Sequence, residues 1–154
     1  MSDININQNE QAREAERAVL GGLMLETHRF DTVIQVIKEN DFDGKDHQII
    51  FQSMSELVEE NKPLDPLTVS EKLDNKNSLN KVGGTDYLIE LATSTPSAAN
   101  LEAYAEIIRQ RSITRKLMKA NSDISELISN PQGQDGASLP VSYTHLTLPT
   151  SRSV

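Results

Sequence analysis

The chain has 154 residues, 36% of them hydrophobic, which is enough for one domain with a modest core. It has no cysteine, which excludes a disulfide scaffold, a thiol nucleophile and a cysteine-ligated metal. A net charge of −8 indicates that the chain does not hold nucleic acid by itself, because phosphate binding needs clustered Lys and Arg. No segment looks like a signal peptide or a membrane span, so we expect a cytoplasmic protein without membrane contact.

The first 25 residues predict a polar start followed by a helix. Residues 1–10 are expected to form a flexible extension, with Asn9 as the cap of the helix. The apolar positions recur at helical spacing, at Ala15, Ala18, Val19, Gly22 and Leu23. Because glycine in a helix costs about 1 kcal/mol relative to alanine, the pair Gly21-Gly22 predicts either close packing of another backbone or a break in the helix.

Four further short helices are predicted before residue 96. Their expected starting signals are Thr27, Asp46, Asp65-Pro66 and Gly83-Gly84. With few aromatic residues, the core is expected to consist mainly of Ile, Leu, Val, Ala and Met, which is typical of packed helices. Residues 11–95 therefore predict a compact helical head in an all-α protein.

A single long helix is predicted next, in the region 96–131. Residues 97–129 contain no Gly or Pro, and a helix of this length would extend about 50 Å, well beyond a small head. One apolar stripe contains Leu101, Tyr104, Ala105 and Ile108, and a second contains Ile113, Leu117, Ala120, Ile124 and Leu127 at coiled-coil spacing. Because the stripes are out of phase, the second half is expected to pack on a different neighbour, either a returning helix or another subunit.

Residues 132–154 are predicted to be a disordered tail. From residue 137 onward the chain has no Asp or Glu and is dominated by Ser, Thr, Leu and Pro, without periodicity. This segment looks like cloning or sequencing material translated onto a truncated gene. A natural low-complexity linker is the alternative.

The usual signatures of nucleotide and metal sites are missing from the sequence. A phosphate loop ends in Gly-Lys-Ser or Gly-Lys-Thr, whereas Gly44-Lys45-Asp46 lacks both the preceding glycine and the hydroxyl. The three histidines, at 28, 47 and 145, are too widely separated in the sequence for a ligand pair. We therefore expect no catalytic, cofactor or metal site.

A basic cluster stands out in this acidic chain. Five of the fifteen basic residues lie within eleven positions, at Arg109, Arg111, Arg115, Lys116 and Lys119. The cluster is either a solvated helix face paired with acids such as Glu102 and Glu106, or an electrostatic docking site for an acidic partner surface.

Three sequence blocks, read together, carry a resemblance to a known family. They are AERAVLGGLML at 15–25, VGGTDYL at 82–88 and TPSAAN at 95–100, and they occur in the same order and with nearly the same separations as in the N-terminal domain of bacterial hexameric DnaB-type replicative helicases. The similarity extends from about residue 15 to residue 133 and includes Asp41-Phe42, His47, the segment 64–68 and the segment 104–109.

The resemblance implies a function in replication without a motor. In that family this domain is a helical head followed by a helical hairpin; hairpins pair between subunits, the pairs form a collar on the ring, and the collar binds the C-terminal domain of primase. The chain resembles a fragment truncated before the second hairpin helix and the RecA-like ATPase domain. ATP, Mg and ATP-dependent 5'-3' unwinding of DNA would then belong to the parent protein, and this chain would serve collar assembly and primase docking.

Under this resemblance we place self-association and primase contact on specific side chains. They are Tyr87, Arg109, Ile113, Arg115, Leu117, Met118 and Ile124. The alternative for each is ordinary core packing, which full burial of Met118 would indicate. Two rival functions stay open, namely a small self-contained all-α enzyme with a charged pocket at Arg109, Arg115 and nearby acids, and a helical adaptor outside replication.

Overall fold

The computed structural model describes residues 2–95 and 97–130, and within these ranges it is helical without strands. The chain divides into two units, Met1–Ile113 and Thr114–Val154. The α-helices are α1 (Ser2–Leu25), α2 (Phe30–Ile34), α3 (Lys45–Glu59), α4 (Pro66–Asn75), α5 (Gly84–Ser94) and α6 (Leu101–Ser129), with short 3-10 helices at Thr27–Arg29, Glu39–Asp41 and Asn80–Val82. The predicted all-α class is confirmed.

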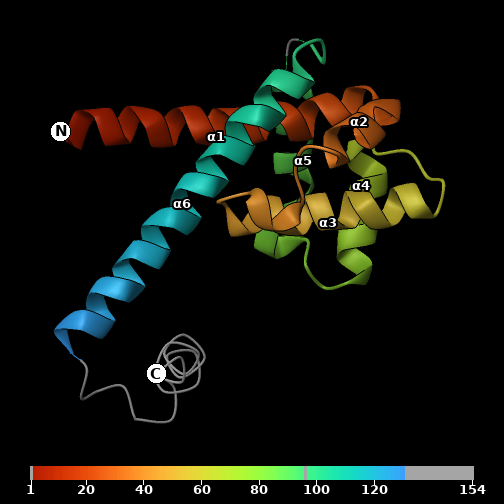
Figure 1. The fold of residues 1–154 in the computed structure, drawn as a ribbon. Coiled ribbons are helices and arrows are strands. Elements are labelled where there is room, and N and C mark those ends of the chain that lie inside the picture. The colour runs from red at the N-terminus through yellow and green to blue at the C-terminus, as the bar shows by residue number, and fades with distance from the viewer. Residues whose placement is uncertain (1, 96, 131–154) are drawn as a thin grey trace, which may run out of the picture. The chain divides into compact units, whose positions relative to one another are not determined.

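Helices α1 and α5 lie side by side at the glycine pair (Figure 1). A Cβ atom on Gly21 would lie 2.0 Å from Thr95 Oγ1 and 2.2 Å from the carbonyl oxygen of Leu91, so only glycine fits there. On Gly22 it would lie 2.4 Å from a methyl carbon of Leu101. The close approach of another backbone explains the pair, and the alternative of a helix break is wrong because α1 continues to Leu25.

Local signals account for the bounds of α4 and α5. Asp65 Oδ1 accepts a hydrogen bond from the Thr68 amide at 3.0 Å, and Pro66 takes the first helical position, as predicted. Gly83 (φ 102°) and Gly84 (φ 77°) form the left-handed turn from which α5 starts. The glycine pair therefore sets the direction of α5 and the place of the side chains in its first turn.

Asparagines in the left-handed conformation end two helices. Asn61 (φ 59°) follows α3 and Asn77 (φ 57°) follows α4. In each case the next amide returns to the helix, from Lys62 to the Leu57 carbonyl at 2.9 Å and from Ser78 to the Leu73 carbonyl at 2.8 Å. These are Schellman caps with asparagine in place of glycine.

The core of the Met1–Ile113 unit lies between α1, α3, α4 and α5. Helix α3 packs on α4, α4 on α5 and α5 on α1 (Figure 1). The chain's three phenylalanines meet there, with the ring centroid of Phe51 5.4 Å from that of Phe30 and 5.0 Å from that of Phe42. The other large buried side chains are aliphatic, as predicted: Leu20, Leu23, Ile37, Ile50, Met54, Leu57, Leu64, Leu73, Leu88 and Leu91.

The first half of α6 belongs to this unit. Its buried residues are Leu101, Ala105, Ile108 and Ser112, which follow the first predicted stripe. Glu102 accepts two hydrogen bonds from Arg29 Nη2, at 2.6 and 2.5 Å, and Ser112 Oγ donates to Asp41 Oδ1 at 2.7 Å. Polar bonds therefore hold both ends of the buried segment.

Three predicted helix starts are wrong. Helix α1 begins at Ser2 and not after Asn9, whose side chain accepts a hydrogen bond from Arg111, since an established helix extends at the cost of ordering one residue at a time. Thr27 accepts from the Leu64 amide instead of capping α2, and Gly44 occupies the N-cap position of α3 that was assigned to Asp46. The predicted tail at 132–154 lies outside the described residues.

Candidate interaction surfaces

Exposed apolar side chains gather on the second half of α6. Leu117 is 65% exposed, Met118 67%, Ile124 56% and Ile128 75%, and Ile113, the last residue of the first unit, is 39% exposed. Leu117, Ile124 and Ile128 are spaced by seven and four residues, which places them on one side of a helix. Because Met118 is exposed, packing in the core of the described residues does not explain why an apolar side chain occupies this position.

The basic residues near the middle of α6 are partly engaged. Arg109 Nη1 lies 3.6 Å from Glu106 Oε1, and Arg111 donates to the side chains of Gln8 and Asn9. Glu102 is paired with Arg29 and not with the basic cluster. Arg115 is half-buried and Lys116 and Lys119 are exposed. The paired-face interpretation therefore holds for Arg109 with Glu106, and Arg115 stays a predicted contact residue.

Tyr87 lies in a polar cluster built from α1, α3 and α5. Its hydroxyl is 2.6 Å from His47 Nε2, and His47 Nδ1 is 2.7 Å from Glu16 Oε1. Glu16 and His47 are buried, while Tyr87 is half-buried. Glu16 also accepts from the amides of Asp43, at 2.6 Å, and Gly44, at 3.4 Å, just before α3. One carboxylate thus links three segments of the head.

The short contacts of this cluster fit one consistent pattern of donors and acceptors. In the tautomer of a neutral His47 with its proton on Nδ1, this atom donates to the Glu16 carboxylate, which only accepts hydrogen bonds when ionised. Nε2 is then the acceptor for the Tyr87 hydroxyl. Arg13 Nη1 lies 3.3 Å from His47 Nδ1, but both are donors, and the bonds of Arg13 go to Asp46 at 3.0 and 2.8 Å.

The surroundings change the acidity of two groups in the cluster. The hydrogen bond from Arg13 lowers the pKa of Asp46, and the positive charge of Arg13 adds to this effect. Burial raises the pKa of the Tyr87 phenol, which keeps its proton available to His47. The Arg17 guanidinium lies 5.8 Å from the centroid of the Tyr87 ring and pairs with Glu90 at 2.9 Å.

Sequence reasoning placed Tyr87 at a contact surface but missed the partners that hold it. The sequence analysis did not identify Arg13 or Glu16 as members of this cluster, nor the hydrogen bonds between Arg13 and Asp46. A signal was present, since Glu16 lies four residues after Ala12 and four before Leu20, on the apolar side of α1. A carboxylate at such a position needs a buried partner.

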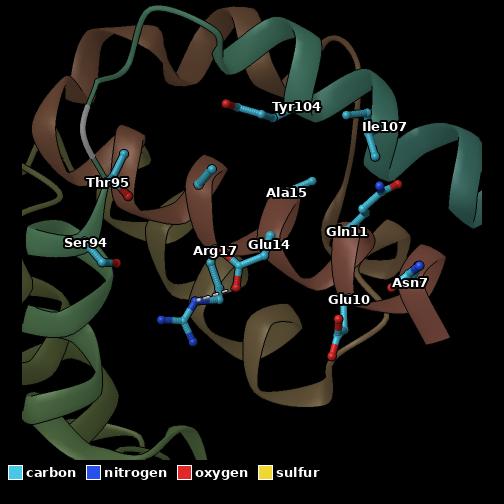
Figure 2. Close-up of a pocket in the computed structure, with 11 residues that line it drawn as sticks. Asn7, Glu10, Gln11, Glu14, Ala15, Arg17, Ser94, Thr95, Tyr104 and Ile107 are labelled. Carbon is cyan, nitrogen blue, oxygen red and sulfur yellow. Dashed lines mark ion pairs between the residues drawn. The ribbon is translucent and has the colours of Figure 1, made fainter.

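A cavity of about 650 Å³ opens between α1, the end of α5 and the first half of α6. Figure 2 shows Tyr104 and Ile107 on α6, and Glu10, Glu14, Ala15 and Arg17 on α1, where Arg17 Nε lies 3.7 Å from Glu14. Arg109 and Arg115 do not line this cavity, so it is not the charged pocket that the rival enzyme hypothesis requires. The cavity is thus lined by both apolar and charged side chains.

Residues 2–95 and 97–130 hold neither a group of metal ligands nor a membrane-spanning helix. No group of three or more His, Asp or Glu side chains in this part of the chain is placed to share a metal ion. None of its helices combines the length and apolar content that crossing a bilayer requires.

Known proteins similar to the chain are replicative helicases. It is 40% identical over 126 residues to the replicative DNA helicase DnaB of Buchnera aphidicola subsp. Baizongia pistaciae, an alignment that covers 82% of this chain and 27% of that protein. It is 38% identical over 113 residues to the replicative DNA helicase DnaC of Bacillus subtilis, covering 73% of this chain and 25% of that protein. The chain thus spans about a quarter of the length of these curated relatives.

Solved structures and a family description agree with this similarity. The N-terminal domain of DnaB helicase from Mycobacterium tuberculosis has a TM-score of 0.75 and 30% identity, covering 81% of this chain and 85% of that one. The corresponding domain from Helicobacter pylori, described with its interactions with primase, has a TM-score of 0.71 and 27% identity, covering 80% and 97%. Residues 8–110 match the DnaB-like helicase N-terminal domain. The chain belongs to the family of DnaB-like helicase N-terminal domains.

Proposed function

We propose that the chain is the assembly and docking domain of a replicative DNA helicase. Its second half of α6 associates with another copy of the domain in the ring collar, and the domain docks the C-terminal domain of primase. The parent protein unwinds duplex DNA 5'-3' with ATP and Mg in the bacterial cytoplasm. The chain itself hydrolyses no ATP and does not bind DNA directly, in keeping with its lack of a Gly-Lys-Ser or Gly-Lys-Thr loop and its charge of −8.

The exposed stripe of α6 is the observation that carries this proposal. Leu117, Met118, Ile124 and Ile128 are all more than half exposed on one helix. Large exposed side chains scattered singly are ordinary, but several within twelve residues mark a contact surface. A helix with such a stripe buries it against another helix through side chains three, four and seven residues apart.

Membership of the family supports the choice of partner. The similar domain from Helicobacter pylori is described with its interactions with primase, which makes primase the first partner to test for this chain. Among the exposed residues, Met118 suits such a surface, because its unbranched thioether adapts to different neighbours. Tyr87 adds an aromatic ring, a frequent centre of binding energy.

Binding of the C-terminal domain of primase from the same organism tests the proposal. The measurement is isothermal titration calorimetry with the unmutated 154-residue chain, called the parent chain from here on, and with a Met118→Asp variant. A carboxylate in the centre of an apolar contact is expected to weaken binding about tenfold or more. Absence of binding by the parent chain would refute primase docking, and full binding by the variant would refute the contact at Met118.

Leu67→Asp is the matched control for this experiment. Leu67 is 71% exposed on α4, close to the 67% of Met118, so both variants place one charge on an exposed apolar position. The control is expected to bind primase as the parent chain does. Equal weakening by both variants would indicate a charge effect rather than a contact on α6.

A further inference from the structure

The hydroxyl of Tyr87 points into its own domain. It lies within hydrogen-bond distance of His47 Nε2, at 2.6 Å, and Arg13 Nη2 donates to the same oxygen at 3.4 Å. The ring planes of Tyr87 and His47 are nearly parallel, with 6° between them. The hydroxyl is thus engaged within the domain, while Tyr87 as a whole is only half-buried on α5.

The geometry points to Glu16 and His47 as positioning residues that hold the Tyr87 ring for a docking partner. The partner contacts the ring and not the hydroxyl, which is already engaged with His47 Nε2 and Arg13. Its chemistry is therefore an apolar or cationic group that packs on an aromatic ring, and not an acceptor that needs a hydroxyl donor. This inference rests on the proposed function, in which Tyr87 is a docking residue.

The backbone before Tyr87 gives a reason for such anchoring. Gly83 and Gly84 both have positive φ, and α5 starts only three residues before Tyr87. The first turn of a helix lacks intrahelical acceptors for its amides and frays easily. A chain of hydrogen bonds to α3 and α1 therefore fixes the side chain in the first turn of α5.

The burial of the cluster supports a positioning role in addition to a stabilising one. Glu16 is 2% exposed and His47 is fully buried, and taking such groups out of water costs more than packing apolar side chains of the same size. Fully bonded networks of this kind fix one geometry. Arg17, 5.8 Å from the ring centroid and paired with Glu90, restrains the ring from a second side.

A double-mutant cycle in the full chain tests the inference. The variants are Tyr87→Phe, His47→Gln and the double variant, and the measurement is the Kd for the C-terminal domain of primase. Loss of one hydrogen bond is expected to weaken binding about three- to tenfold in each single variant. Both single variants lose the hydrogen bond between the Tyr87 hydroxyl and His47 Nε2. The Kd of the double variant should therefore be no higher than the higher of the two single-variant Kd values.

Other results of this cycle would overturn the inference. Independent losses that multiply in the double variant would mean that the hydroxyl contacts the partner directly. Unchanged binding of Tyr87→Phe would mean that the anchor has no effect on docking. Tyr104→Phe combined with His47→Gln is the matched control, and its effects are expected to multiply independently, since Tyr104 lies on α6 outside the cluster.

A second measurement covers the case in which His47→Gln does not fold or the parent chain does not bind primase. The chain has three tyrosines, so fluorine NMR of the chain labelled with 3-fluorotyrosine gives few signals, which Tyr87→Phe and Tyr104→Phe assign. In Glu16→Gln the Tyr87 signal should shift or broaden and the Tyr104 signal should not. An unchanged Tyr87 signal would overturn the positioning role, whereas absent primase binding alone would overturn only the proposed function.

Discussion

The two halves of α6 have opposite environments. In the first half Leu101, Ala105 and Ile108 are buried, and Ser112 bonds to Asp41. In the second half Leu117 and Ile124 are exposed although they are equally apolar. Fully burying a leucine or isoleucine contributes about 1.5–3 kcal/mol relative to leaving it exposed. The first half therefore contributes to folding, and burial of the second half supplies the free energy that the proposed association would use.

The strongest test of the folding side is Gly21→Ala. Its Cβ atom would lie 2.2 Å from the Leu91 carbonyl oxygen, which is backbone and cannot rotate away. We expect destabilisation of about 3 kcal/mol or more, despite the better helix propensity of alanine. Urea unfolding followed by circular dichroism measures it, and an unchanged midpoint would show that α1 and α5 do not approach as closely as described.

Gly22→Ala is the matched control for Gly21→Ala. It adds the same methyl group one residue later, where the nearest atoms belong to the side chain of Leu101. A side chain can adjust, so the variant should lose clearly less free energy of unfolding than Gly21→Ala. The reverse order would contradict the assignment of the backbone contact to Gly21.

Glu16→Leu is expected to have the next largest effect. It removes the acceptor of His47 Nδ1 and of the Asp43 amide in the buried cluster. A buried donor without an acceptor costs about 1–3 kcal/mol, and the variant leaves two such donors. We therefore expect the free energy of unfolding to fall by about 2–4 kcal/mol. The measurement is again urea unfolding, and a loss below about 0.5 kcal/mol would mean that the network does not hold the head together.

Asp46→Asn sharpens the account of the same cluster through pH. The pKa of Asp46 is lowered in the folded state by the hydrogen bond from Arg13, so its stabilisation is present above the unfolded pKa and is lost as pH falls through the folded pKa. Because the Arg13 side chain is 41% exposed, we expect only about 0.5–1 kcal/mol at neutral pH. Unfolding from pH 7 to pH 2 should show the parent chain losing this advantage over the variant below about pH 4. If the free energies of unfolding of the two chains fell in parallel with pH, the stabilising role of the ionised Asp46 would be refuted.

The sequence predicted the parts of the fold that local patterns encode. The glycine pair of α1, the Asp65-Pro66 start of α4 and the first stripe of α6 all have signals within a few residues. The start of α1 was misplaced because the helix extends beyond the capping signal at Asn9, whose side chain accepts a hydrogen bond from the distant Arg111. The bonds among Glu16, His47 and Tyr87 join positions 31 and 40 residues apart, which no local pattern specifies.

The smallest expected change in stability belongs to the second half of α6. Replacing Leu117 and Ile124 by Asp alters two exposed positions, so the free energy of unfolding should stay within about 0.5 kcal/mol of the parent value. Ile89→Asp, at a 42% exposed position on α5, is the control for a charge on an exposed apolar site. A loss of 2 kcal/mol or more in the double variant would mean that these side chains serve folding instead.

Light scattering of the full chain and of the Leu117→Asp, Ile124→Asp variant, across concentration, tests most directly whether this stripe is an association surface. We predict that the average mass of the parent chain rises above the 17.1 kDa of a monomer as concentration increases, while the variant stays at that mass. A parent chain that stays monomeric at every concentration would contradict the proposal that this stripe is an association surface. A variant that associates as strongly as the parent chain would also contradict it.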